Sequence, residues 1–376
     1  MDMKYDVCIL GAGRIGYAAA YDLRRLGYNV LAVDIRDKPL NRIKDSLDIA
    51  TLKLKPGLNS IAELKDKARL IVSSLPIDIS REYVEYMIEN GYTLVDVSSV
   101  PEDKISYYEK IVKESGGKAF LYAGVAPGMA QTLSGALYSE LDGLDRLEIY
   151  VGGLPLEPED KPLKTNITWN PIGFLWQYNI TCRKVVDGEV KGFDPFEDKG
   201  LIKLPGEGEY EYFLSDGLRT LLYTLKDVPN MAEYTLRYKG HLRDMLLLRD
   251  LGFIDLEPVE VEGCKVVPLK FTAKLFDLKL SKDPRDKTLL AVYGYSGDVK
   301  AVYYSYTVYD EELGLTGMQM ATGFNLARYG HMLLQDLFEW DIILPEYVGL
   351  DRGLFKRYLR EIEDSGLKIY RVEERI

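Results

Sequence analysis

Three glycines near the start of the chain have the spacing of a phosphate-binding turn. An apolar run ends at Leu10, and Gly11, Gly13 and Gly16 follow it directly. In such a turn the first glycine permits a tight bend, the second lets the backbone approach a pyrophosphate, and the third lets the next helix pack on the strands. The start of that helix offers N–H groups and a partial positive charge to phosphate oxygens. Because an amphipathic stretch and a second apolar run follow, the pattern predicts a dinucleotide-binding site.

Asp34 ends the second apolar run, at the position where such sites carry an acid. A carboxylate there binds both hydroxyls of the adenine ribose and repels the phosphate that distinguishes NADP, so it favours NAD. Arg36 keeps NADP open, because its side chain could bind that phosphate instead of lying in solvent as an ordinary surface arginine. The predicted cofactor site comprises Gly11, Gly13, Arg14, Ile15, Gly16, Asp34, Ile35, Arg36, Ser74, Leu75, Pro76, Val97 and Ser98.

The elements that must position these residues alternate between strands and helices. Strand-like apolar runs and helical patterns follow one another over 70–75, 79–90, 93–97, 102–114 and 118–122. This order predicts an α/β fold with a doubly wound parallel sheet, as in the Rossmann fold. Ligands of such sheets bind beyond the carboxyl ends of the strands, which is where Ser74, Asp96 and Ser99 fall.

After about residue 123 the pattern becomes that of an α+β domain with a mostly antiparallel sheet. A strand is expected over 147–151, before a pair of glycines, and hairpins are expected over 182–190 and 288–309. Helices are expected over 216–225, capped by Ser215, and over 242–251, 271–278, 318–337 and 353–364. We therefore expect a dinucleotide-binding domain over 1–123 and a substrate, catalytic and oligomerisation domain over 124–324. The C-terminal helices of 325–376 are expected to return to the first domain.

The composition excludes several classes of function. With 376 residues, of which 47% are hydrophobic and 28% charged, the chain suits a globular protein of two domains. A net charge of −11 argues against binding to nucleic acid or to an anionic membrane, and no apolar run is long enough to span a bilayer. Three dispersed cysteines and two histidines suggest neither a disulfide framework nor a metal site. We therefore expect no metal, no signal peptide and a cytoplasmic location.

Several later motifs make the chain resemble the saccharopine dehydrogenase-like family. They are GVAPGM at 124–129, YVGGLP at 150–155, PL at 162–163, ITW at 167–169, SDGLRTLL at 215–222, TLRYKGH at 235–241, LLRDLG at 247–252, TG at 322–323 and LPE at 344–346. The pattern covers nearly the whole chain and, within the family, is most similar to the L-lysine 6-dehydrogenases. The resemblance implies an NAD-linked oxidation of the amine of a small amino acid.

The resemblance also defines the reaction to be expected and its alternatives. Lysine 6-dehydrogenases remove a hydride from C6 of L-lysine, and water then releases ammonia and leaves 2-aminoadipate 6-semialdehyde. Saccharopine reductases reduce an imine formed with glutamate and usually carry an acid where this chain has Ala126, so this departure favours a smaller substrate. Lys239 and Asn170 stand where related sequences often have proline and serine. Two alternatives stay open: a saccharopine or carboxynorspermidine-type imine reductase, and a nucleotide-binding regulatory protein without turnover.

Amine oxidation needs a base for the proton of an ammonium group, whose pKa is about 10.4, and a cation for the α-carboxylate. The resemblance makes Arg237 the first candidate for the carboxylate, since the family holds a substrate arginine in this segment. Arg219 is the runner-up, although it could simply brace its helix. His241, whose side chain suits proton transfer, and Asp96 are the candidates for handling the proton.

Two further residues complete the predicted substrate site. Trp169 would form a wall of the pocket, with core packing as the commoner fate of a tryptophan, and Ser99 would reach the substrate. His331 lies on a helical pattern and is expected to be packed or at the surface. The tyrosine-rich hairpin of 288–309 is expected to form a sheet surface or a dimer surface, and we expect a homo-oligomer, with a dimer favoured.

Overall fold

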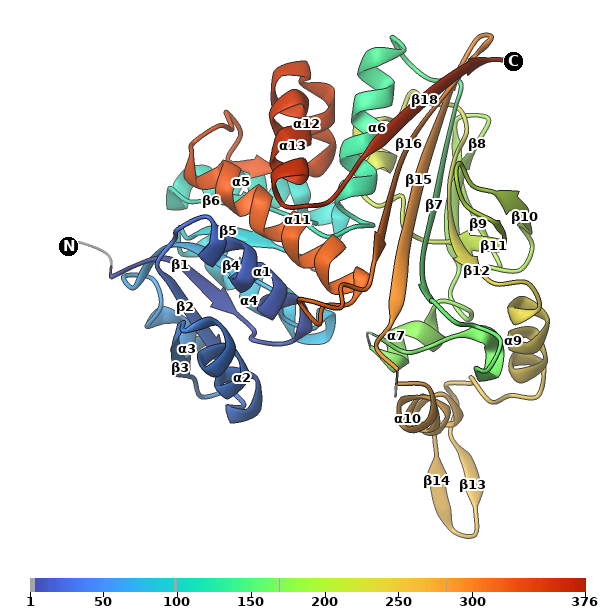
Figure 1. The fold of residues 1–376 in the computed structure, drawn as a ribbon, viewed down its shortest axis with the longest axis horizontal. Helices are drawn as coiled ribbons and strands as arrows, with labels where there is room; N and C mark the ends of the chain where they lie inside the picture. Colours follow the sequence, from blue (N-terminus) through green and yellow to red (C-terminus); the bar gives the residue numbers. More distant parts are fainter. Residues whose placement is uncertain (1–3, 98–99, 169, 282) are drawn as a thin grey trace. The chain divides into compact units, whose positions relative to one another are not determined.

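The computed structural model describes residues 4–97, 100–168, 170–281 and 283–376, which form two compact units (Figure 1). Unit 1 comprises Met1–Ser139 and Gln319–Lys368, and unit 2 comprises Glu140–Met318 and Ile369–Ile376. Ser98, Ser99 and Trp169, which belong to the predicted site, lie outside the described residues.

Unit 1 contains a seven-stranded sheet in which every described strand pair is parallel. In spatial order the strands are β3 (Ala50–Lys53), β2 (Val30–Asp34), β1 (Tyr5–Leu10), β4 (Ala68–Ser73), β5 (Thr93–Asp96), β6 (Lys118–Phe120) and β17 (Ile342–Ile343). Its first six strands have the order 3-2-1-4-5-6 of dinucleotide-binding folds. The predicted Rossmann-type α/β fold is confirmed.

Helices connect the strands of unit 1 and cover its sheet (Figure 1). They are α1 (Arg14–Arg25), α2 (Asp37–Leu47), α3 (Leu58–Ala62), α4 (Ile77–Glu89), the 3-10 turn η1 (Glu102–Lys104), α5 (Ile105–Ser115), α6 (Met129–Glu140), α11 (Gly317–Leu334), α12 (Pro345–Leu350) and α13 (Arg352–Asp364). The interior strand β1 is consequently buried, with Val7, Cys8 and Ile9 inaccessible to solvent. Such a continuous apolar run is what a parallel sheet with covered faces requires.

Unit 2 contains a nine-stranded mixed sheet. Its strands are β7 (Arg146–Pro155), β8 (Cys182–Val186), β9 (Glu189–Phe193), β10 (Lys199–Lys203), β11 (Glu209–Ser215), β12 (Met231–Arg237), β15 (Asp286–Ser296), β16 (Val299–Val308) and β18 (Tyr370–Arg375). Of the described pairs in this sheet, only β7 with β12 is parallel, so the predicted, mostly antiparallel sheet is confirmed.

Alternation along β12 gives this sheet two different faces. One face carries an apolar cluster rich in tyrosine, to which Tyr150, Tyr234 and Tyr293 belong. Alternate residues of β12, namely Glu233 and Arg237, lie on the opposite face, and both are buried. The strand therefore places two ionisable side chains on the same face of unit 2.

Short helices and a small hairpin complete unit 2. They are η2 (Pro162–Lys164), α7 (Pro171–Trp176), α8 (Leu221–Thr224), α9 (His241–Asp250), β13 (Val259–Val261), β14 (Cys264–Val266) and α10 (Pro268–Leu280). A second apolar core joins Phe174 of α7, Met245 of α9 and Leu269 of α10 to Phe213 of β11. This core packs the helices next to the carboxyl end of β12.

Two predicted local structures in unit 2 are wrong. Within 216–225 only Leu221–Thr224 is helical, because Ser215 belongs to β11 and donates a hydrogen bond to Glu233 (3.1 Å) instead of capping a helix. The glycines at 152–153 lie inside β7 and not after it. A Cβ at Gly152 would come within 2.8 Å of the Cβ of Leu236, so the neighbouring strand demands glycine there.

The boundaries between the two compact units also differ from the expected domain boundaries. Unit 1 continues through α6 to Ser139 instead of ending at residue 123, and it takes up the chain again from Gln319. The last residues form β18, which pairs with β16 in unit 2 and is not part of a returning helical segment. Every residue of β18 is exposed, so the sequence lacks the apolar periodicity that would predict this strand.

Candidate functional site

The glycine turn joins β1 to α1 with the geometry of a phosphate-binding loop. Gly11 has φ of +95°, and a Cβ at Gly16 would lie 1.9 Å from the carbonyl oxygen of Gly11, so the protein's own backbone requires both glycines. A Cβ at Gly13 would meet nothing within 4 Å beyond its chain neighbours. Packing within the protein therefore does not explain Gly13, and the open space beside it fits the pyrophosphate of a dinucleotide.

Asp34 lies at the carboxyl end of β2 and is only 7% exposed. Its Oδ2 accepts a hydrogen bond from the backbone N–H of Ala12 (3.0 Å), which fixes the carboxylate beside the glycine turn. Its Oδ1 accepts from the backbone N–H (2.9 Å) and the Nε (3.2 Å) of Arg36, whose side chain is 64% exposed. This carboxylate is positioned for the hydroxyls of an adenine ribose, with Arg36 as a loosely held neighbour.

The other predicted cofactor residues follow neighbouring strands at the same edge of the sheet. Ser74 Oγ donates a hydrogen bond to the carbonyl oxygen of Gly11 (2.7 Å), and the N–H of Val97 donates to the carbonyl oxygen of Ser73 (3.1 Å). Exposed or half-buried positions near the turn are occupied by Arg14, Ile15, Ile35, Leu75 and Pro76. The strands β1, β2, β4 and β5 therefore bring the described part of the predicted cofactor site together, as a doubly wound sheet requires.

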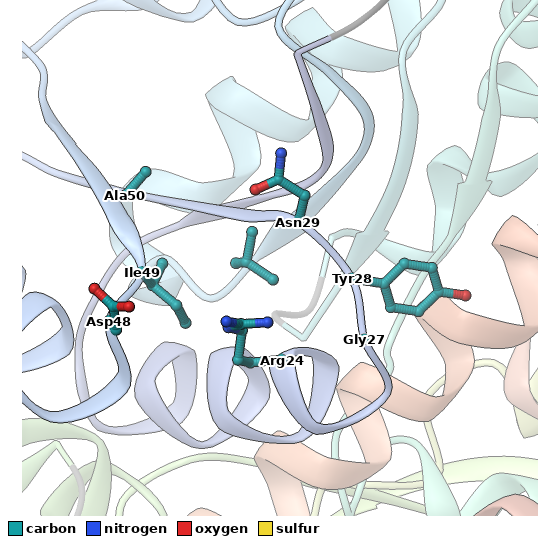
Figure 2. Close-up of a pocket in the computed structure, with 8 residues that line it drawn as sticks. Arg24, Gly27, Tyr28, Asn29, Asp48, Ile49 and Ala50 are labelled. Atoms are coloured by element: carbon teal, nitrogen blue, oxygen red, sulfur yellow. The ribbon is translucent and has the colours of Figure 1, made fainter.

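A separate hollow of unit 1 lies at the other end of β2. Figure 2 shows this pocket of about 170 Å³, which is lined by Arg24, Gly27, Tyr28, Asn29, Val30, Asp48, Ile49 and Ala50. Val30 begins β2, whereas Asp34 ends it. Because ligands of such sheets bind at the carboxyl ends of the strands, the pocket does not belong to the cofactor site.

Arg237, at the end of β12, has a buried side chain surrounded by aromatic rings. Its guanidinium carbon lies 5.0 Å from the ring centre of Phe174, 5.8 Å from that of Phe213 and 6.0 Å from that of Tyr178. Nε donates a hydrogen bond to the hydroxyl of Tyr178 (2.9 Å), and Nη1 donates to the carbonyl oxygen of Leu236 (2.7 Å). Among the described residues, no carboxylate pairs with this guanidinium. A buried charge without a counter-ion is costly, so this is a favourable place for a bound anion.

His241 is fully buried, and both of its ring nitrogens are engaged. Nδ1 lies 2.7 Å from the carbonyl oxygen of Leu163, so it carries the proton and donates. Nε2 then accepts from the hydroxyl of Tyr178 (2.7 Å), which in turn accepts from Arg237. Burial, together with the nearby charge of Arg237, lowers the pKa of His241 to about 3. A neutral histidine in this chain of hydrogen bonds orients Arg237 and is poorly suited to the predicted proton transfer.

The remaining predicted substrate residues occupy different surroundings. Asp96 ends β5 in unit 1 and is fully buried. Arg219, in a loop of unit 2 with φ of +50°, has Nη1 4.0 Å from a carboxylate oxygen of Asp216, which Arg183 also binds at 2.8 Å. Arg219 therefore braces a local ion-pair cluster, whereas Arg237 has no such carboxylate among the described residues.

Neither of the two departures in unit 2 from related sequences introduces a group into the surroundings of Arg237. Lys239 forms an ion pair with Glu209 in which both side chains are about half exposed. Asn170 caps α7, accepting hydrogen bonds from the N–H groups of Ile172 (2.9 Å) and Gly173 (3.3 Å). Serine is an equally good cap, so the exchange preserves the start of the helix.

Sequence reasoning missed Tyr178, Phe174 and Phe213, which surround Arg237, and it missed Glu233. Tyr178 lies 59 residues before Arg237, and no local spacing connects the two. Glu233 is a buried carboxylate that accepts a hydrogen bond from Ser215, and burial raises its pKa to about 7. A glutamate inside a mostly apolar strand is the signal that could have singled out Glu233.

Two further features concern metal binding and membrane insertion. Within the ranges that the structure describes, no three His, Cys, Asp or Glu side chains gather as metal ligands would. None of the described helices combines the length and the apolar character needed to cross a membrane.

The fold and the glycine turn define a protein with a dinucleotide-binding unit and a second, mostly antiparallel unit. A family model for the saccharopine dehydrogenase C-terminal domain matches residues 124–367, and the chain belongs to the saccharopine dehydrogenase family. Family and fold together make it an NAD(P)-dependent oxidoreductase.

Two similar proteins illustrate how far the likeness reaches. The apo saccharopine dehydrogenase (L-Glu forming) from Saccharomyces cerevisiae is 16% identical with a TM-score of 0.79, over 98% of this chain and 100% of that one, which shows a shared fold. Digeranylgeranylglycerophospholipid reductase from Sulfolobus acidocaldarius is 52% identical over 44 residues. That stretch is 12% of this chain and 9% of the relative, so the chain matches less than a tenth of that relative's length.

Proposed function

We propose that this protein oxidises the side-chain amine of L-lysine with NAD, giving 2-aminoadipate 6-semialdehyde and ammonia. The observation that carries the proposal is Arg237. Its guanidinium is buried and oriented by Tyr178, and no described carboxylate neutralises it. The α-carboxylate of an amino acid is an anion that a guanidinium binds in a planar, bidentate geometry.

The role proposed for each residue follows from its surroundings. Arg237 holds the carboxylate, while Tyr178 and His241 fix the direction of its N–H groups. Asp96, the other candidate for the proton, is buried at the carboxyl end of β5, and its role as the base stays a prediction. The two sequence candidates for the proton are thereby separated into a positioning histidine and a proposed base.

When NAD is bound, its nicotinamide would accept the hydride. The ammonium first loses its proton to the base, and the neighbouring carbon then gives up a hydride, which leaves an iminium group. Water adds to the iminium carbon, and loss of ammonia yields the aldehyde. The chain's own residues bind the carboxylate, orient the substrate and take up the proton.

We also propose that NAD is preferred over NADP. Asp34 is held beside the glycine turn by the N–H of Ala12 and presents its carboxylate where the ribose hydroxyls would bind. A phosphate on that ribose would meet the same negative charge. Arg36 partly offsets the repulsion, but its side chain is mostly exposed and already pairs with Asp34.

A substrate screen tests the proposal against its alternatives. Purified protein is mixed with NAD or NADP and a panel of amines, and the absorbance band of the reduced cofactor is followed. The proposal predicts reduction with L-lysine and NAD. Turnover only with semialdehyde, glutamate and NADPH would identify an imine reductase instead, and binding of NAD without turnover of any amine would identify a regulatory protein.

A further inference from the structure

Unit 2 carries exposed apolar side chains on α9, on the segment that follows it, on the hairpin strand β13 and on α10. We call this group the apolar arm surface, and it comprises Leu247, Leu251, Phe253, Leu256, Val259, Val261, Phe271, Leu275 and Leu278. Each of these side chains is between 39% and 64% exposed. In Figure 1 the hairpin projects beyond α10, at the end of unit 2 that is farthest from β18.

Helix α10 is apolar on two sides. Leu269, Ala273 and Leu280 point into the second core of unit 2, where they are buried. Phe271, Leu275 and Leu278 have the spacing i, i+4 and i+7, so they form a separate stripe on the same helix. A helix with an apolar stripe outside its core contact normally has a second partner.

The arm is built rigidly enough to present this surface. The N–H of Leu269 donates a hydrogen bond to the carbonyl oxygen of Asp255 (3.0 Å), and Thr272 Oγ1 donates to that of Phe253 (2.7 Å). These bonds tie α10 to the loop after α9. Strands β13 and β14 pair only with each other among the described strands, and a lone two-stranded hairpin is marginal in water. A partner would stabilise it.

The exposed area matches what a stable dimer needs. At roughly 200 Å² for a fully exposed large apolar side chain, the nine residues expose on the order of 900 Å². A standard protein interface buries about 800 Å² on each partner. The arm surface alone therefore offers enough apolar area for one side of such an interface.

The charges around the surface complement one another between two copies. Between Glu257 and Val266 the chain carries three glutamates and one lysine, whereas α10 carries three lysines and one aspartate. Lys274 pairs with Asp277 within α10 (3.5 Å), and among the described residues Glu257, Glu262, Lys270 and Lys279 form no such pair. A twofold axis repeats each contact, so an acidic hairpin that meets a basic helix does so twice.

We propose that the apolar arm surface binds the same surface of a second copy of this chain, forming an isologous dimer. The proposal goes beyond the enzymatic function, which needs no partner of this kind. It also commits the expected homo-oligomer to a defined surface, and this surface is not the tyrosine-rich hairpin of the sheet.

Light scattering after size-exclusion chromatography of the full chain tests the proposal. Phe271→Asp and Leu278→Asp place a charge on the stripe of α10 and should halve the mass of the wild-type particle. Leu201→Asp is the matched control, because Leu201 is 54% exposed, like Phe271 at 53%, but lies on β10. The control should keep the wild-type mass, and melting curves should show all three variants folded.

Cys264 provides a second readout that does not depend on a variant. It lies on β14 opposite Val261 and is exposed, whereas Cys8 and Cys182 are buried. Its reaction with a thiol reagent should slow at least fivefold as the protein concentration rises through the dimerisation range, and Phe271→Asp should restore the fast rate. A wild-type chain that stays a single copy at every concentration would overturn the proposal, as would a mass unaffected by Phe271→Asp. If Phe271→Asp changes only lysine turnover, something other than a second copy covers the surface.

Discussion

Replacing Tyr178 with phenylalanine would remove a single oxygen from the centre of the proposed carboxylate site. That hydroxyl accepts from Arg237 at 2.9 Å and donates to His241 at 2.7 Å, and all three side chains are buried. The Tyr178→Phe ring retains the apolar volume, so no cavity follows beyond the hydroxyl itself. Two polar groups are left without their partner inside the protein.

The size of the effect follows from those two orphaned groups. A buried donor or acceptor that loses its partner costs about 1–3 kcal/mol, so with two such groups the variant should lose about 2–6 kcal/mol of unfolding free energy. For a unit of this size that corresponds to a fall in Tm of roughly 4–24 °C. A guanidinium that has lost one of its two hydrogen bonds should also bind the substrate carboxylate less well, raising the KM for lysine about tenfold or more.

Calorimetry and steady-state kinetics measure both effects on the same samples. The KM for NAD should stay within twofold of the wild-type value, because Tyr178 belongs to unit 2 and the glycine turn to unit 1. Tyr223→Phe is the matched control, since Tyr223 is 54% exposed and its variant should behave like the wild type. A Tyr178→Phe protein with unchanged Tm and unchanged KM for lysine would refute the reasoning.

Three further predictions concern the cofactor turn and a buried carboxylate. Gly16→Ala should lower the Tm of the cofactor-free protein, because the new Cβ would lie 1.9 Å from the carbonyl oxygen of Gly11. Gly13→Ala should leave that Tm unchanged yet weaken NAD binding at least tenfold by calorimetric titration. Equal effects of the two variants would contradict the assignment of Gly13 to the pyrophosphate. Asp34→Ala should reduce the kcat/KM ratio of NAD to NADP about tenfold or more, and an unchanged ratio would exclude the ribose contact. Burial raises the pKa of Glu233 from 4.5 to about 7, so the folded state favours its neutral form, whose stabilising contribution is present below pH 4.5 and is lost as the pH rises through 7. Between about pH 4.5 and 7 this group should therefore lower the free energy of unfolding of the wild type by up to about 1.4 kcal/mol per pH unit. Glu233→Gln should remove that decline, and parallel profiles for the two proteins would show that Glu233 does not titrate there.

The dinucleotide unit could be predicted from the sequence because its signals are local. The glycine spacing, the apolar run before Gly11 and the acid at Asp34 all lie within one strand–helix–strand segment, and each has a steric or electrostatic reason. The alternation of strands and helices then predicts a parallel sheet, since parallel strands need crossover connections.

In the second unit, contacts between residues far apart in the chain could not be predicted from local sequence patterns. Arg237 could be chosen from its motif, but the residues around it come from α7 and the turn after it, from β11 and from η2, and only the fold brings them together. The side chain of His241 and its place in the motif beside Arg237 favour proton transfer, whereas burial and two hydrogen bonds make a positioning role the better hypothesis. Ser215 could be mistaken for a helix cap because serine suits both caps and strand ends, and its partner Glu233 is 18 residues away.

The central claim is that Arg237 binds the carboxylate of the substrate, and a comparison of two substrates tests it most directly. L-lysine and 1,5-diaminopentane share the amine to be oxidised, but only lysine has the carboxylate. Losing one partner of a buried charge pair costs about 2–5 kcal/mol, so the wild type should favour lysine in kcat/KM by roughly 30-fold or more. Arg237→Gln, checked for folding by its melting curve, should lower kcat/KM for lysine by about that factor and leave the value for 1,5-diaminopentane within threefold. If Arg237→Gln lowered both values equally, or left the preference for lysine intact, the carboxylate would not bind at Arg237.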